Sequence, residues 1–180
     1  NSRLAYDEII SKFCFAVEAH TLKKKITSND ISFQYRQAVP FSDECIEIVD
    51  DTLTKFMKCV LGWEDFKFSF NKATIFSWFV YIRRNLDLET IDLQNTISYM
   101  EFCRAYIKGK YKKVDNKYIK TFSSLQKKVP FFEVMLNTFN QRTSMGSTDA
   151  LSIIYRDIII TLFKDMMWNE KSALLQYTMD

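Results

Sequence analysis

Turn-forming residues are nearly absent from this sequence, and their scarcity restricts the fold more than any other feature. Glycine occurs three times and proline twice among 180 residues, whereas average usage of the two together is about 12%. Sandwiches and barrels of many short strands need frequent turns, so the sequence excludes them. Collagen-like and Gly/Pro-rich disordered chains are excluded as well. We therefore predict an all-α fold, with residues 1–180 forming a single globular helical domain.

The composition and the cysteine pattern narrow the class of protein. Hydrophobic residues make up 47% of the chain and charged residues 26%, which excludes intrinsic disorder. Charges are spread along the whole chain, so no association with a membrane is expected. The chain begins at Asn1 without an initiator Met or a secretory leader, so we expect a fragment of a longer, cytoplasmic protein. Four widely spaced cysteines predict small core residues in a reducing compartment.

Apolar residues recur at steps of three and four along most of the chain, which is the spacing of one helix face. We expect six or seven helices. The longer helical segments are 3–22, 42–62, 71–84, 87–109 and 149–168, and the shorter ones are 27–39, 117–127 and 131–139. Segment 71–84 is apolar around most of its circumference, so it should be central. Residues 63–70 alternate phenylalanine with polar residues, and we interpret them as an extended connector whose rings fill the core.

All of the excess positive charge lies in one window of the sequence. Residues 101–130 contain nine basic and two acidic side chains, whereas the net charge of the whole chain is +3. Within it, residues 104–128 form a basic segment that also bears aromatic rings: Tyr106, Tyr111, Tyr118 and Phe122. Lysines can neutralise phosphates and exposed rings can stack on unpaired bases, so the pattern favours a nucleic-acid surface. The candidate binding residues are Arg104, Lys108, Lys110, Lys112, Lys113, Lys117 and Lys120.

Two other interpretations of this segment stay open. It could be a solvated linker whose aromatic rings dip into the core, or a surface for an acidic protein partner.

A second candidate site precedes the last predicted helix. Gly146 and several hydroxyl residues stand where backbone N–H groups of a helix N-terminus can bind a phosphate or carboxylate. The candidate anion-binding residues are Arg142, Ser147, Thr148 and Arg156. The segment lacks the GxxxxGK[ST] pattern and is not a P-loop. The alternative is that Ser147 or Thr148 only caps the helix, while Arg156 makes an internal salt bridge or a carbonyl contact.

Signatures of catalysis are missing from the chain. A single histidine, with no nucleophile motif beside it, argues against a catalytic triad. We expect no catalytic residue, no metal ligand, no cofactor and no enzymatic activity in this chain. An enzyme whose site is assembled from scattered Asp, Glu and Arg residues is the remaining alternative.

Three short stretches resemble the C-terminal helical region of ParB-like, GmrS-type proteins, many of which belong to restriction or anti-phage systems. They are Asn1-Ser2-Arg3-Leu4 with Asp7-Glu8, the run FNKATIF at residues 70–76, and residues 146–149 continuing to Tyr155-Arg156. The resemblance implies a helical half that supports an N-terminal ParB/sulfiredoxin-like nucleotide domain. The DGQQR motif of that domain does not occur in this sequence, so no catalytic role is transferred.

Residues and resemblance together lead to one functional expectation. The chain should be a non-catalytic helical module of a ParB-like bacterial defence protein, with DNA and the N-terminal domain or a partner protein as its contacts. The alternative is a helical protein–protein interaction or structural domain without a role in nucleic-acid binding.

Overall fold

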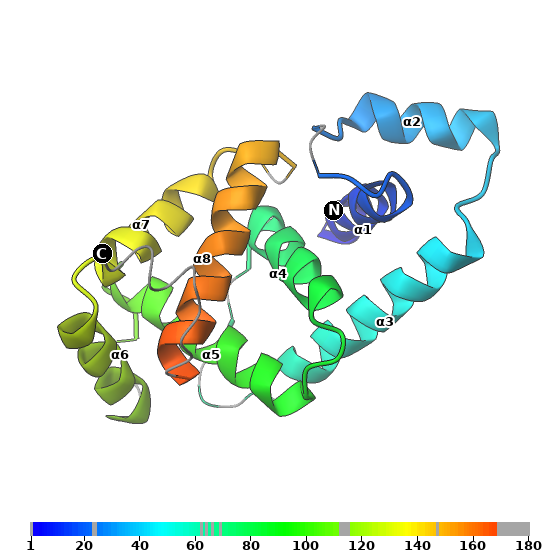
Figure 1. The fold of residues 1–180 in the computed structure, drawn as a ribbon. Coiled ribbons are helices and arrows are strands. Elements are labelled where there is room, and N and C mark those ends of the chain that lie inside the picture. The colour runs from blue at the N-terminus through cyan, green and yellow to red at the C-terminus, as the bar shows by residue number, and fades with distance from the viewer. Residues whose placement is uncertain are drawn as a thin grey trace.

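The computed structural model describes residues 2–22, 25–61, 63, 65, 67, 68, 70–111, 116–146 and 148–168. These residues form eight α-helices and contain no strand, so the predicted all-α class is confirmed (Figure 1). The expected number of six or seven helices is wrong, because every short helical segment folds as a helix of its own. The helices are α1 Ser2–Glu18, α2 Ser28–Gln37, α3 Asp43–Val60, α4 Lys72–Arg84, α5 Thr90–Tyr106, α6 Asn116–Lys128, α7 Phe132–Arg142 and α8 Ala150–Trp168.

Polar side chains fix where several helices begin. The Ser42 Oγ accepts a hydrogen bond from Cys45 N at 3.2 Å, and the Asn71 Oδ1 accepts one from Thr74 N at 2.8 Å. Thr27 forms a complete capping box at the start of α2. Such caps satisfy N–H groups that have no partner within the helix. The side chains of Thr27 and Ser42 therefore fix the first turns of α2 and α3.

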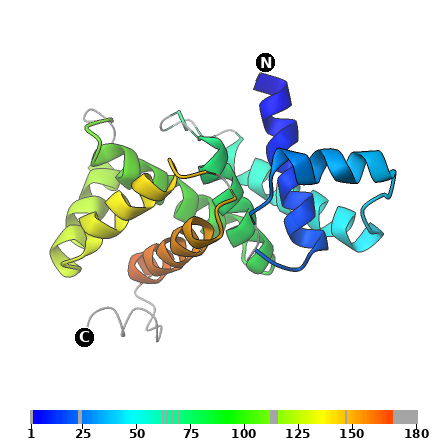
Figure 2. The same cartoon turned by 90° about the horizontal axis from the view of Figure 1, so that it is seen from above.

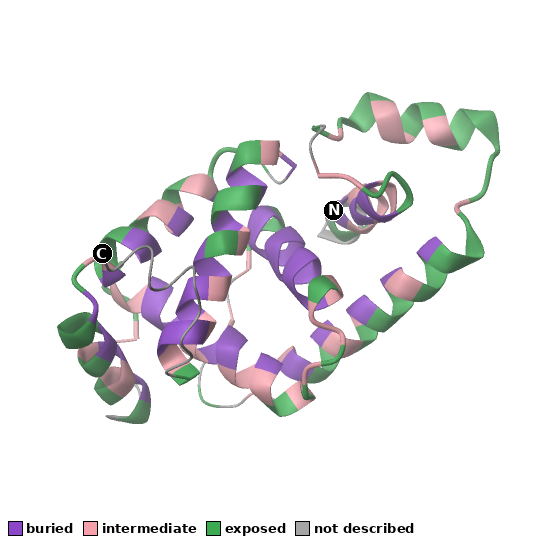
Figure 3. Ribbon diagram, viewed as in Figure 1, coloured by how far each residue is buried: buried purple, intermediate pink, exposed green. Residues whose placement is uncertain are grey.

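Helix α4 lies at the centre of the molecule, as predicted. Each of its residues from 73 to 82 is buried, and α1, α3 and α8 all pack against it (Figure 3). Aromatic contacts lock these helices together. The ring centroids of Phe13 and Phe76 lie 6.1 Å apart and those of Phe56 and Phe79 5.3 Å apart, both edge to face. Such pairs contribute beyond the area that they bury.

Helices α2 and α6 lie at opposite ends of the molecule (Figure 2). Helix α2 contains no buried residue and packs beside α1. Helix α6 instead packs on α5 and α7 through an apolar face. No described helix is both long and apolar enough to cross a membrane.

The connector and the cysteines match their predicted roles. Phe68 and Phe70 stack with centroids 5.0 Å apart, and both pack against the core. Residues 64, 66 and 69 of the connector lie outside the described part of the chain. All four cysteines are free thiols, and Cys45, Cys59 and Cys103 are buried. Burial raises the pKa of Cys59 to about 11, so this thiol stays protonated and behaves as an apolar core group.

Candidate nucleic-acid interface

The basic segment starts in the last turn of α5, passes through a tight turn and continues along α6. Gly109 has a φ of +79°, in the left-handed region that glycine adopts without steric cost. Lys110 N donates to Ala105 O at 3.1 Å across this turn. Helix α5 itself ends at Tyr106, three residues before the predicted end of the segment at 109, and Lys108 and Lys110 flank the turn. Lys112 and Lys113 lie outside the described residues.

Arg104 is a buried residue, which corrects its assignment to the nucleic-acid surface. Only 6% of it is exposed. Its Nη1 donates to Glu101 Oε1 at 2.5 Å, and its Nε donates to Asn140 Oδ1 at 3.1 Å. The guanidinium also lies 4.1 Å from the ring centroid of Phe139. A buried guanidinium needs such a carboxylate partner, so Arg104 joins α5 to α7.

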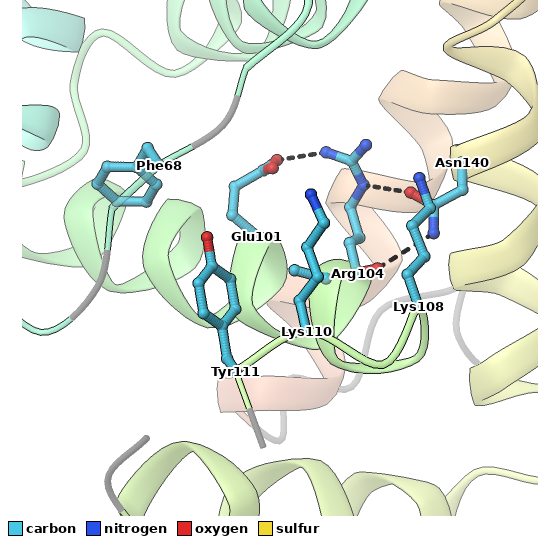
Figure 4. A pocket seen from close by; sticks show the side chains of 8 residues that line it. Phe68, Glu101, Arg104, Lys108, Lys110, Tyr111 and Asn140 are labelled. Carbon is cyan, nitrogen blue, oxygen red and sulfur yellow. Dashed lines mark hydrogen bonds and ion pairs between the residues drawn. The ribbon is translucent and has the colours of Figure 1, made fainter. Parts of the chain in front are cut away.

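A small pocket of about 60 Å³ lies where α5 ends against α7 (Figure 4). In Figure 4 the side chains of Lys108 and Lys110 extend toward Arg104 and Asn140. Burial, together with the positive charges of Arg104 and Lys110, lowers the pKa of Lys108. The residues of this pocket that bear polar side chains are Glu101, Arg104, Lys108, Lys110, Tyr111 and Asn140.

The outward face of α6 carries a second group of lysines. Successive residues are rotated by about 100° in a helix, so residues at spacings of three, four and seven share one side. Lys120 and Lys127 are seven residues apart and lie on the same side of α6. Lys117 and Lys128 both lie next to that side. Each of these four lysines is exposed, whereas the opposite face of α6 buries Tyr118, Phe122 and Leu125.

Lys117 differs from the other lysines of α6 because its ammonium group pairs with a carboxylate of the same chain. Its Nζ lies 2.7 Å from Asp65 Oδ2, which also accepts a hydrogen bond from Tyr118 Oη at 2.6 Å. These two donors, Lys117 first, lower the pKa of Asp65. The side chain of Lys117 therefore anchors the connector to α6.

The rings of Tyr118 and Phe122 do not reach the surface. Both are buried, and the ring of Tyr118 stacks on Phe102 with centroids 5.0 Å apart. The two remaining rings, Tyr106 and Tyr111, are half-buried and also stack on Phe102. The prediction that Tyr118 and Phe122 stack on bases is therefore wrong, because apolar burial on α5 outweighs exposure.

The loop before α8 does not present its helix N-terminus to an anion, which corrects the second predicted site. The carboxylate of Asp149 accepts a hydrogen bond from Ser152 N at 2.9 Å and so caps the helix itself. Thr148 is buried, and its Oγ1 donates to Ile26 O at 2.8 Å. The alternative of a cap at Thr148 is also wrong, and Ser147 lies outside the described residues.

Arg156 points into the core instead of toward a ligand. It is fully buried, its Nε donates to Ser77 Oγ at 2.7 Å, and its Nη1 donates to Arg142 O at 2.7 Å. The alternative of a carbonyl contact is thus confirmed. Burial lowers the pKa of Arg156 to about 10, so the guanidinium stays charged at neutral pH. The guanidinium of Arg142 lies 4.5 Å from the ring centroid of Tyr155.

Sequence reasoning missed two residues that shape the pocket. Glu101 and Asn140 come from α5 and α7, 39 positions apart. The spacing of three between Glu101 and Arg104 was the available signal, because such residues are neighbours on a helix. Nothing in the sequence pointed to Asn140.

The described residues contain no group of three or more His, Cys, Asp or Glu side chains that could hold a metal ion. Comparisons with protein-family models, curated proteins and solved structures found no match to this chain.

Proposed function

We propose that this chain is a non-catalytic helical module that binds the phosphate backbone of nucleic acid through lysines at the end of α5 and along α6. One observation carries the proposal. Five exposed lysines of the basic segment have no ion pair within the described part of the chain: Lys108, Lys110, Lys120, Lys127 and Lys128.

Three cations elsewhere in the described part of the chain have a carboxylate partner, which compensates their charge. Lys12 and Lys72 both pair with Glu8, and Arg84 lies 2.9 Å from Asp157. Unpaired lysines concentrated in one segment leave a local excess of positive charge. Such an excess attracts polyanions, because binding releases the cations condensed on their phosphates.

The spacing of the lysines on α6 suits a phosphate backbone. Lys120 and Lys127 are two turns apart, which corresponds to roughly 10 Å along the helix axis. That distance corresponds to about three nucleotide steps along the axis of a duplex, at roughly 3.4 Å of rise each. Since Tyr118 and Phe122 are buried, base stacking is not part of the proposal, and we expect binding with little sequence preference.

Fluorescence anisotropy with labelled single-stranded DNA and RNA tests the proposal. The double variant Lys120→Glu/Lys127→Glu should bind on the order of tenfold more weakly than the unmodified chain, because two phosphate contacts become repulsive. Lys58→Glu is the matched control, since Lys58 is an exposed lysine on α3. It should change the affinity less than about twofold. Equal affinity of all three proteins, or no binding at low salt, contradicts the proposal.

We further propose that this helical module belongs to a ParB-like defence protein, as the sequence resemblance implies. It rests on the three sequence stretches and on the all-α fold that the resemblance implies. The sequence encoded directly before Asn1 tests this extension. A DGQQR-bearing domain there supports it, and an unrelated domain contradicts it.

A protein-interaction role is the second candidate, and α2 favours it. This helix has no buried residue: its Phe33 and Tyr35 are exposed, and so is Val39 just after it. Hydrogen exchange of the amides of 28–37, measured in the isolated chain and with a partner protein added, tests the role. Protection by the partner supports a contact at α2, and equal exchange argues against it.

A further inference from the structure

The pocket between α5 and α7 holds more positive charge than its own carboxylate neutralises. Three cations, Arg104, Lys108 and Lys110, line it together with the single carboxylate of Glu101. The Glu101 Oε1 already accepts hydrogen bonds from Arg104 at 2.5 Å and from Trp78 Nε1 at 2.9 Å. Among the described residues that line the pocket, no second carboxylate compensates the ammonium groups of Lys108 and Lys110.

Groups that are themselves fixed enclose this pocket. Asn140 accepts from Arg104 Nε through its Oδ1 and donates to Arg104 O through its Nδ2 at 3.3 Å. On another side, Tyr111 Oη donates to Lys67 O at 2.6 Å. The volume of about 60 Å³ equals roughly two water molecules in the liquid. The pocket therefore admits a group of only a few heavy atoms.

We propose that this pocket binds the terminal phosphate of a nucleic-acid strand between the ammonium groups of Lys108 and Lys110. The inference rests on the nucleic-acid binding proposed above. A phosphate monoester carries a charge of about −1.5 to −2 at pH 7, which matches the two uncompensated ammonium groups. A phosphodiester inside a strand carries only one negative charge, so it compensates one of the two ammonium groups and should bind there more weakly than a terminal phosphate.

The chemistry of lysine suits this ligand. Each ammonium group offers three donors and acts as a point charge toward phosphate oxygens. Arg104 adds positive potential at the base of the pocket, although its Nη1 and Nε already donate to Glu101 and Asn140. A bound dianion also offsets the repulsion among the cations that, together with burial, lowers the pKa of Lys108.

Competition anisotropy with three versions of one short single strand tests the inference. The strands carry a 5′-phosphate, a 3′-phosphate or hydroxyl groups at both ends. One phosphorylated strand should bind about tenfold more tightly than the hydroxyl strand, as expected for a charge-assisted contact. Lys110→Gln should abolish this preference and leave the affinity for the hydroxyl strand within a fewfold. Lys127→Gln, the matched control on α6, should weaken all three strands equally and keep the preference.

The outcomes separate this inference from the proposed function. Equal binding of all three strands overturns the terminal-phosphate site and leaves backbone binding intact. Failure of every strand to bind overturns both. A phosphoserine peptide that competes better than the phosphorylated strand overturns nucleic acid as the source of the phosphate. Lys110 is exposed, so the thermal midpoint of Lys110→Gln should match that of the unmodified chain, and circular dichroism checks its fold.

Discussion

At the scale of single residues, the side chain of Arg156 joins three helices. It extends from α8 to the Ser77 hydroxyl on α4 and to the Arg142 carbonyl at the end of α7. Arg156→Met removes these hydrogen bonds and leaves the Ser77 hydroxyl and the Arg142 carbonyl without this donor. The free energy of unfolding should fall by about 2 to 4 kcal/mol, measured by urea denaturation. Arg142→Met, which removes a partly exposed cation–π contact, should cost about 1 kcal/mol or less. Equal losses would contradict the bridging role of Arg156.

Single residues also show where sequence reasoning fails. Patterns of apolar spacing place arginine on the surface, yet Arg104 and Arg156 are both buried. Their burial depends on partners from other helices, Asn140 for Arg104 and Ser77 for Arg156. Such long-range pairing is not encoded in local spacing, so Arg104 was assigned wrongly, and the carbonyl contact of Arg156 was only one of the alternatives.

At the scale of helices, Glu8 ties α1 to α4 through Lys72 and is also paired with Lys12 on α1. These two partners, Lys12 first, lower the pKa of Glu8 from 4.5 to about 2. Because the pKa is lower in the folded state, the stabilisation is complete above pH 4.5 and is lost as the pH falls toward 2. Glu8→Gln should cost about 1 kcal/mol at pH 7, since the pair is partly exposed. Thermal unfolding at several pH values checks this. A difference between the two proteins that does not shrink in acid would contradict it.

Helix boundaries were the best-predicted feature of the fold, because they depend on local chemistry. Thr27 and Ser42 cap their helices through side-chain oxygens, and Gly109 takes the left-handed conformation. The cap at Asp149 was missed, although Ser147 and Thr148 beside it were considered. Three neighbouring polar residues offer equivalent oxygens in sequence, whereas in the structure Asp149 accepts from Ser152 N and Thr148 donates to Ile26 O.

At the scale of the whole molecule, folding divides the basic segment into groups with different surroundings. The sequence correctly identifies the window that holds the excess charge, because charge is additive along the chain. It could not show that Arg104 lies inside, that Lys117 pairs with Asp65, or that α7 contributes Asn140 to the pocket. Those outcomes follow from how α5, α6 and α7 pack together. The lysines left on the surface define the proposed interface.

The salt dependence of binding to a single strand tests this account most directly. If each of the five exposed lysines neutralises one phosphate, log K should fall against log salt with a slope of about −3.5, at about −0.7 per contact. Lys120→Glu/Lys127→Glu should reduce the magnitude of the slope to about 2, while Lys58→Glu should keep it unchanged. A slope near zero, or the same slope in all three proteins, would contradict binding through these lysines.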